Sequence, residues 1–265
     1  MKKIIATLLL IIAYACTAAA DVYEYEPGPF DRLVVRADID IVYRNVPDSA
    51  GYIRYESGKD FSGKLDVSCS KGKLSIIDRM TEEDYGMLPT LYMYSDYLVS
   101  VSYEGAGTVD IMMQSATPTF SAKLTGNGKI VCSGVNTTEM SANIVTGNGT
   151  IVARGKCVKA KFSLTGTGLI QADELVADEV KCSVMGTGSI GCRPLDLLDV
   201  RGIGTTKIYY HGNPTVRKVG GAKLEKMPDT EDDTLQPRDS AITERKVTTL
   251  PVSDEEPDEA GLENI

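Results

Sequence analysis

The chain has 265 residues, of which 42% are hydrophobic and 25% charged, a composition that can bury a core and excludes disordered and collagen-like classes. Lys and Arg number 28 against 37 Asp and Glu, so the formal charge of -9 argues against nucleic-acid binding. With one histidine, His211, we expect no metal site and no cofactor. The 25 glycines, 13 tyrosines and absence of tryptophan favour a turn-rich β protein.

Residues 1–20 have the composition of an export signal. A positively charged start precedes an apolar run over 4–15, too short to cross a bilayer, and small residues follow up to Ala20. Residues 13–16 also resemble a lipobox, which would leave Cys16 as a lipid-modified N-terminus. Cleavage after Ala20 and lipid attachment at Cys16 both stay open. Either predicts an extracytoplasmic protein that is periplasmic, on the outer membrane surface or secreted, with membrane contact only if Cys16 carries lipid.

Upstream of the repeats, alternation of period 2 begins near Phe30. The apolar residues of this stretch fall on one face of a predicted strand and are Leu33, Val35, Ala37, Ile39 and Ile41. This stretch upstream of the repeats has no Gly-x-Gly motif, and we interpret it as the capping coils of a repeat fold.

A Gly-x-Gly motif then recurs six times, with 16 to 21 residues between successive copies. The copies begin at Gly105, Gly126, Gly147, Gly166, Gly186 and Gly202. A fixed period of this length indicates a stack of similar units, because about 20 residues cannot bury a face alone. Glycine suits a sharp corner between two strands, since it allows positive φ and close backbone approach.

The positions around each motif alternate, and four of them are largely apolar. Before the motif, the two aligned positions hold Val101, Ala122, Asn143, Phe162, Cys182 and Leu198, and Tyr103, Leu124, Val145, Leu164, Val184 and Val200. After it they hold Val109, Ile130, Ile151, Ile170, Ile190 and Thr206, and Ile111, Cys132, Ala153, Ala172, Cys192 and Ile208. The pattern predicts an all-β parallel β-solenoid with coils of about 20 residues, stacked about 4.8 Å apart.

The C-terminal segment 223–265 differs from the rest in composition. It has thirteen acidic residues against five basic ones, four prolines, no aromatic residue and no strand or helix periodicity. We expect a disordered acidic tail there, which leaves 21–222 as the folded domain.

Several stretches of the chain resemble a known family. Residues 30–35 (FDRLVV), 39–42 (IDIV) and 72–76 (GKLSI), then the serial corners and the closing IYYHGNP at 208–214, resemble the putative auto-transporter adhesin, head GIN domain family. The resemblance covers roughly 29–221. It implies an exported or surface protein of Gram-negative bacteria with a right-handed, three-sided β-solenoid (β-helix), and it supplies no catalytic residues.

The first functional hypothesis is a non-catalytic, exported adhesin-like or scaffolding module whose partner is an unknown surface glycan or protein. Tyrosines cluster before the first corner, and exposed tyrosines offer flat faces and a hydroxyl to sugars or proteins. Tyr92, Tyr94 and Tyr97 are the candidate binding residues, and Tyr92 and Tyr94 share strand parity.

The alternative is a carbohydrate-active β-helix enzyme, either a polysaccharide lyase or a glycoside hydrolase, using surface carboxylates. Asp38 and Asp40 are predicted on the outward face of one strand, where two carboxyl groups could flank a glycosidic bond. Asp173, Asp178 and Glu179 lie on adjacent coils, whereas His211 lies in a turn composition and is interpreted as an exposed polar residue. A strand follows each Gly-x-Gly motif, which excludes a phosphate-binding loop.

Five cysteines follow Cys16, and three of them occupy predicted inward columns. Cys132 and Cys192 share a column three coils apart, about 14 Å, which is too far for a disulfide. Cys182 lies in the neighbouring inward column. We therefore predict free, buried thiols at Cys132, Cys182 and Cys192 that pack as small apolar groups.

Overall fold

The structure is a computed structural model that describes residues 21–57, 61, 63–79 and 88–228. The predicted export segment 1–20 with Cys16 lies outside the described residues, as do the acidic residues 229–265. The described residues form β-strands and one short 3-10 helix, η1 (Pro47–Ser49). Among them no helix is long and apolar enough to cross a membrane.

All the strands belong to one hydrogen-bonded sheet. The N-terminal strands are β1 (Asp21–Tyr25), β2 (Arg32–Arg36), β3 (Ile41–Asn45), β4 (Ile53–Ser57), β5 (Leu65–Ser70), β6 (Lys73–Asp78), β7 (Leu91–Ser95), β8 (Ser100–Glu104) and β9 (Thr108–Met112). The longer ones that follow are β10 (Thr117–Thr125), β11 (Lys129–Thr146), β12 (Thr150–Leu164), β13 (Leu169–Gly186) and β14 (Ser189–Gly204), and the last are β15 (Lys207–Tyr210), β16 (Thr215–Gly220) and β17 (Lys223–Lys226).

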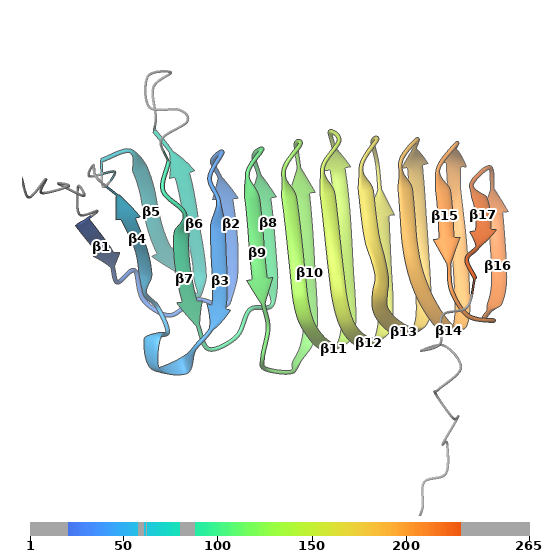
Figure 1. Cartoon of the computed structure of the whole chain (residues 1–265), viewed down its shortest axis with the longest axis horizontal. Coiled ribbons are helices and arrows are strands. Elements are labelled where there is room, and N and C mark those ends of the chain that lie inside the picture. Colours follow the sequence, from blue (N-terminus) through green and yellow to red (C-terminus); the bar gives the residue numbers. More distant parts are fainter. Residues whose placement is uncertain (1–20, 58–60, 62, 80–87, 229–265) are drawn as a thin grey trace, which may run out of the picture. The chain divides into compact units, whose positions relative to one another are not determined.

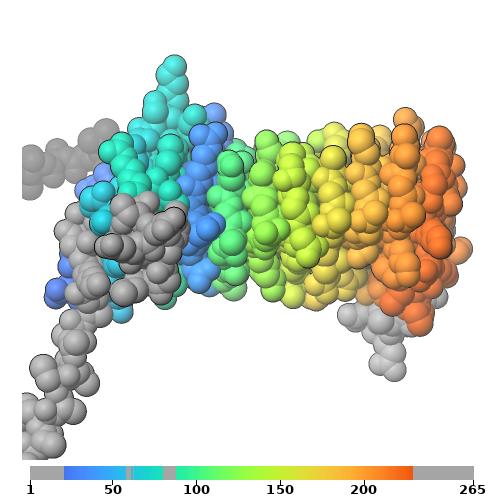
Figure 2. Space-filling view, turned by 90° about the horizontal axis from the view of Figure 1, so that it is seen from above, coloured from blue at the N-terminus to red at the C-terminus, as the bar shows by residue number. Residues whose placement is uncertain are grey.

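The sheet is wound into a β-solenoid of about six turns, as the repeat analysis predicts. From β10 to β14 each strand pairs in parallel with the next along its length (Figure 1). Shifts of register, such as the one between Cys132 and Val135, divide the long strands into straighter segments. The space-filling view shows the same succession of coils from above (Figure 2).

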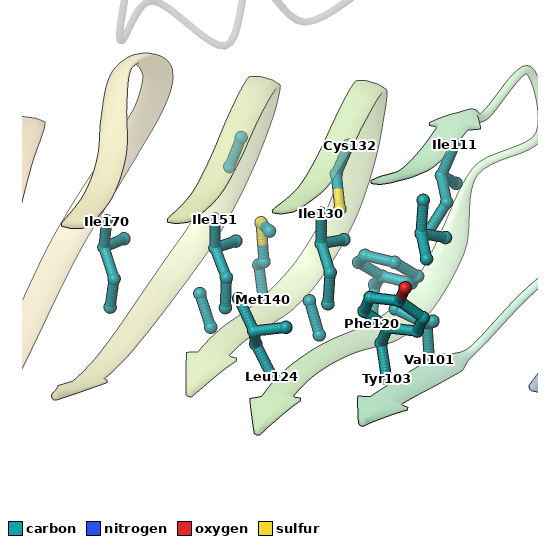
Figure 3. Close-up of a cluster of buried hydrophobic side chains, with 14 of the residues drawn as sticks. Val101, Tyr103, Ile111, Phe120, Leu124, Ile130, Cys132, Met140, Ile151 and Ile170 are labelled. Atoms are coloured by element: carbon teal, nitrogen blue, oxygen red, sulfur yellow. The ribbon is translucent and has the colours of Figure 1, made fainter. Parts of the chain in front are cut away.

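The core is a set of ladders of like side chains along the stack. Ile130, Ile151 and Ile170 pair with one another on successive coils and are completely buried (Figure 3). Alternation in each strand sends these residues inward and their neighbours outward. Burial of one such side chain stabilises the fold by about 1.5–3 kcal/mol, so the ladders supply the stability that a single coil lacks.

The register of the third repeat differs from the alignment made on the sequence. Ala142 pairs with Ala122 and Ile144 with Leu124, so these two residues continue the buried columns, while Asn143 and Val145 are only half-buried. The register shifts after Leu124 and absorbs the extra residue of this 21-residue repeat. The physical reason is that an inward Asn143 would need hydrogen-bond partners in an apolar core.

The sixth repeat is also shifted, by two residues. Gly204, rather than Gly202, pairs with Gly186, and Ile208, rather than Thr206, pairs with Ile190. Ile208 is completely buried and extends the isoleucine ladder. Thr206 is buried as well, but its hydroxyl donates to the Gly186 carbonyl oxygen (2.9 Å), so it belongs to the corner.

The N-terminal coils are not stacked in chain order. Strand β2 pairs with both β6 and β8, and β3 pairs with both β7 and β9, so the first coil lies between two later ones (Figure 1). Beyond β6 and β7 the pairing becomes antiparallel, with β5 on β6, β4 on β7 and β1 on β4. The predicted capping region therefore includes antiparallel strands, which the period-2 pattern alone does not reveal.

The folded domain extends past the boundary at residue 222 that composition predicts. Lys223–Lys226 forms β17, which pairs in parallel with β15. Leu224 pairs with Ile208 and packs against the core, so a single apolar residue is enough to add these four residues to the stack. Composition did not predict this strand, because the other three residues of β17 are charged.

The predicted state of the three thiols is confirmed. Cys132, Cys182 and Cys192 are free and buried, and Ala153 and Ala172 separate Cys132 from Cys192 in one column. Burial raises the pKa of the Cys132 thiol far above its usual value. A hydrogen bond with the Cys192 thiol, together with burial, raises the pKa of Cys182.

This arrangement predicts the accessibility of the thiols. In the folded, non-reduced protein, Cys132, Cys182 and Cys192 should resist alkylation, because all three are buried. After denaturation without reductant all three should react, as mass spectrometry of the alkylated peptides will show. If Cys132 and Cys192 stay unreactive until reductant is added, the stacking register of these coils is wrong.

Candidate functional site

The two tyrosines predicted to lie side by side do share the outward face of β7. Burial alternates along this strand: Leu91 and Met93 are buried, whereas Tyr92 is 39% exposed and Tyr94 half-buried. In the parallel neighbour β3, Arg44 pairs with Tyr94. In the antiparallel neighbour β4, Arg54 pairs with Tyr92.

A third tyrosine, Tyr52, completes this surface. The backbone N–H of Tyr94 donates to the Tyr52 carbonyl (3.1 Å), and that of Gly51 donates to the Tyr94 carbonyl (2.9 Å), so Tyr52 lies next to Tyr94. Two residues before Arg54, it has the same outward parity. Sequence reasoning missed it because it stands forty residues from the tyrosine cluster. We call Tyr52, Tyr92, Tyr94, Arg44 and Arg54 the tyrosine face.

The arginines of the tyrosine face differ in how firmly they are held. The half-buried Arg44 guanidinium donates to the Asp110 carboxylate (2.9 Å) and to its neighbouring carbonyl, that of Tyr43 (2.8 Å). Arg54 is more exposed and makes a longer contact with Glu56 (3.4 Å), and such surface pairs contribute little to stability. Arg44 is thus a fixed donor beside Tyr94, whereas Arg54 is free to reorient.

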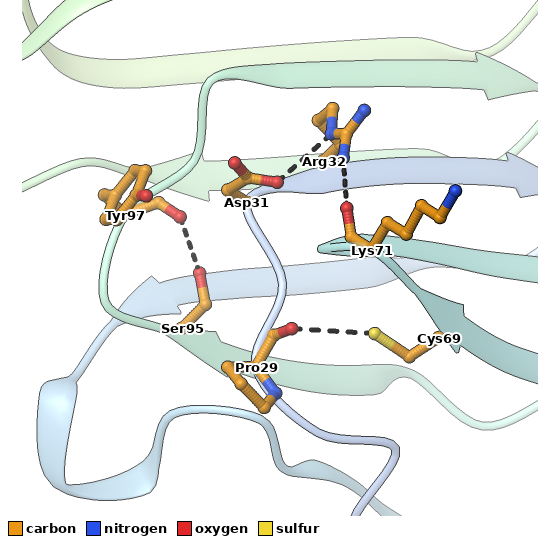
Figure 4. Close-up of polar contacts among 7 residues, drawn as sticks. All are labelled: Pro29, Asp31, Arg32, Cys69, Lys71, Ser95 and Tyr97. Atoms are coloured by element: carbon orange, nitrogen blue, oxygen red, sulfur yellow. Dashed lines mark hydrogen bonds and ion pairs between the residues drawn. The ribbon is translucent and has the colours of Figure 1, made fainter.

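Tyr97, the third predicted binding residue, lies outside β7, in the segment that leads to β8. Its side chain is 47% exposed, and its carbonyl oxygen accepts a hydrogen bond from the Ser95 hydroxyl (2.9 Å; Figure 4). The same segment is joined to the residue before β2, because the Val99 N–H donates to the Asp31 carbonyl (2.8 Å). Beside it, the Arg32 guanidinium contacts the Asp31 carboxylate and the Lys71 carbonyl (Figure 4). The structure therefore does not place Tyr97 on the strands of the tyrosine face.

Buried polar groups support the tyrosine face from below. The Tyr43 and Ser95 hydroxyls share a hydrogen bond (2.7 Å), and burial raises the pKa of Tyr43 to about 12. Asn45 donates to the carbonyls of Ser95 and Asp96 and accepts from the backbone N–H of Ser115 (2.8 Å). These contacts fix the end of β7 against β3, so the tyrosines are held on a rigid support.

The carboxylates of the enzyme hypothesis have a structural use. The sequence pattern predicts Asp38 and Asp40 on one strand, and this prediction is wrong. Both lie at the corner between β2 and β3. Asp38 accepts from the backbone N–H of Ala106 and Asp40 from that of Thr108, both at 2.7 Å. In the next coil, Lys129 donates its N–H to the carbonyl of Gly107 instead (2.9 Å). The two aspartates thus replace backbone acceptors at a corner that has no glycine pair.

Tyr103 lies under the same corner. It is completely buried, donates its hydroxyl to the Ile39 carbonyl (3.2 Å) and accepts from the Gly107 N–H (2.7 Å). Burial raises its pKa to about 12. The neutral Tyr103 hydroxyl therefore joins the two sides of the corner by hydrogen bonds, which explains why the corner accommodates a large buried side chain.

The remaining candidates do not converge on one site. Glu179 forms an ion pair with Lys159 (3.8 Å), and Asp178 has a raised pKa because of burial and then the charges of Asp196 and Glu179. His211 is half-buried after β15, with its backbone N–H bonded to the Cys192 carbonyl (3.1 Å). Within the described residues, no group of three or more His, Cys, Asp or Glu side chains could hold a metal ion.

The corner role of the aspartates predicts a stability effect. Asp38→Ala and Asp40→Ala should each lower the free energy of unfolding by about 1 kcal/mol, because each removes the acceptor of a backbone N–H. Asp48→Ala, an exposed carboxylate of η1, serves as the control and should change stability little. Urea unfolding measures all three. A wild-type protein that cleaves polysaccharides and loses this turnover in Asp38→Asn would contradict the structural role.

Comparisons with known proteins agree with this architecture. The family described as putative auto-transporter adhesin, head GIN domain matches residues 29–214. A putative adhesin from Bacteroides fragilis is 20% identical, with a TM-score of 0.72 over 78% of this chain and 96% of that one. A putative lipid binding protein from Parabacteroides distasonis is 18% identical, with a TM-score of 0.64 over 80% and 98%.

At these identities the solved structures establish the fold alone, and no curated protein matches the chain. The family match covers most of the described coils, from three residues before β2 to the turn after β15. The chain belongs to the putative auto-transporter adhesin, head GIN domain family.

Proposed function

We propose that the protein is an extracytoplasmic, non-catalytic adhesin-like module that binds a surface glycan through the tyrosine face. The observation that carries the proposal is the grouping of Tyr52, Tyr92 and Tyr94 with Arg44 and Arg54 on one outward face. Family membership supports an adhesin-like role but names no ligand. Export through residues 1–20, with either cleavage after Ala20 or lipid attachment at Cys16, is part of this proposal.

A sugar is the ligand whose chemistry fits this face. The rings of Tyr92 and Tyr94 provide flat apolar area, which suits the C–H faces of a pyranose, and their hydroxyls add hydrogen bonding. Arg44 is held in place by Asp110, so its remaining donors are available at low entropic cost. A protein partner would use the same residues, and a glycan-binding experiment distinguishes a glycan ligand from a protein ligand.

The non-catalytic part of the proposal rests on the use of the candidate carboxylates. Asp38 and Asp40 already accept backbone hydrogen bonds at the corner between β2 and β3. A glycosidase needs two carboxyl groups that face one bond with their oxygens available to it. The carbohydrate-active enzyme remains the alternative, and a screen for released reducing ends or unsaturated sugars tests it.

Binding should depend on the tyrosines of β7 and not on Tyr97. On an array of bacterial and host surface glycans, wild-type protein should bind a subset, and Tyr92→Ala and Tyr94→Ala should each weaken that binding about tenfold. Tyr97→Ala removes a similarly exposed tyrosine outside the face and should bind as the wild type does. Far-ultraviolet circular dichroism confirms that each variant is folded.

Equal loss of binding in Tyr92→Ala and Tyr97→Ala would contradict the role of this face. If the wild-type protein binds no glycan on the array but binds a defined surface protein, and Tyr92→Ala abolishes that binding, the ligand of this face is a protein and not a glycan.

A further inference from the structure

A groove lies on another face of the solenoid, over β10, β11, β12 and β13. Its volume is about 410 Å³, which is in the range of ligand sites, and eight of its ten lining residues have polar side chains. One row of the groove is built from residues paired in register across these four strands: Ser121, Ser141, Lys161 and Lys181. The Ser141 hydroxyl donates to that of Ser121 (3.0 Å), so the serines already form a ladder.

A second row runs parallel to the first, two residues further along each strand. It consists of Lys123, Asn143, Ser163 and Ser183, again paired in register. Neighbouring strands are about 4.8 Å apart, so hydroxyl and amide groups recur at that interval along the stack. Each hydroxyl both donates and accepts, which makes the surface a repeating hydrogen-bonding template.

The charge of the groove is opposite to that of the chain. Three lysines and no carboxylate line it, although the formal charge of the whole chain is -9. Lys161 is paired with Glu139 at the margin (2.6 Å). Within the part of the chain that the structure describes, neither Lys123 nor Lys181 forms an ion pair. Their ammonium groups are therefore available to an anion. The two lysines lie three strands apart along the stack and two residues apart along the strand direction, a separation of roughly 16 Å between backbone positions.

We propose that this groove binds a linear anionic glycan, one that carries carboxylate or sulfate groups, with the polymer running across the strands along the stack. Lys123 and Lys181 hold two acidic groups of the polymer, and the serine and asparagine rows bond to the sugar hydroxyls between them. The spacing of the lysines fits a repeating ligand better than a small anion, which only one of them could contact at a time.

This site is separate from the tyrosine face. The strands of the groove form one side of the coils, in which β8 pairs with β10 and β10 pairs with the last segment of β11. The strands of the tyrosine face form another side, in which β3 pairs with β9 and β9 pairs with the first segment of β11. The proposal therefore goes beyond the proposed function and does not depend on it.

The test uses full-length protein and three polymers: polygalacturonate, dextran sulfate and uncharged dextran. Wild-type protein should bind at least one of the anionic polymers, more weakly at higher salt, and should not bind dextran. The Lys123→Gln/Lys181→Gln variant should raise the dissociation constant about tenfold or more, since it removes two charge-assisted contacts. Affinity electrophoresis or biolayer interferometry measures this.

The matched control is Lys129→Gln/Lys207→Gln, which makes the same charge change at exposed lysines on the first segment of the coils. It should bind these polymers as the wild type does. Tyr92→Ala should also bind them as the wild type does, because a loss of glycan binding in that variant on the array tests the tyrosine face and not the groove. The proposal is overturned if neither anionic polymer binds, if dextran binds equally well, or if the control loses as much affinity as the groove variant. Thermal unfolding confirms that both lysine variants remain folded.

Discussion

The close approach of backbone atoms at the Gly-x-Gly corners is the constraint on which the rest of this fold depends. Corner N–H groups donate to carbonyls of the preceding coil at 3.0 Å, as from Thr150 to Gly128 and from Leu169 to Gly149. Gly147 has φ of 91°, and a Cβ added there would collide with the Gly126 carbonyl oxygen. Only glycine satisfies both conditions, so the corners set how closely and in which register the coils stack.

Register decides which side chains reach the surface together. Because alternation has a period of two residues, a coil shifted by one position would bury its polar residues and expose its ladder. The observed register places isoleucines above isoleucines inside, and tyrosines beside arginines or serines beside lysines outside. Both proposed binding surfaces are therefore consequences of the stacking and need no loop or lid to form them.

The sequence predicts the repeated part of this fold well, because glycine spacing and alternation report the same register in most coils. It misplaces Asn143 and Gly202, where repeats of 21 and 16 residues leave a choice that only packing resolves. The insertion of β2 and β3 between later strands depends on long-range pairing that no local pattern encodes. The tyrosine face could be predicted in part, while Tyr52 and the groove required knowledge of which strands are neighbours.

The most direct test of the central claim compares Gly147→Ala with Gly63→Ala by equilibrium unfolding. Gly63 has open space around the position of a Cβ and no positive φ, so its replacement should leave stability nearly unchanged. At Gly147, unfavourable φ and the backbone collision should together cost roughly 2–4 kcal/mol of unfolding free energy. If the two variants are equally stable, close approach at the corners does not hold the stack together, and the dependence of the fold on its glycine corners is contradicted.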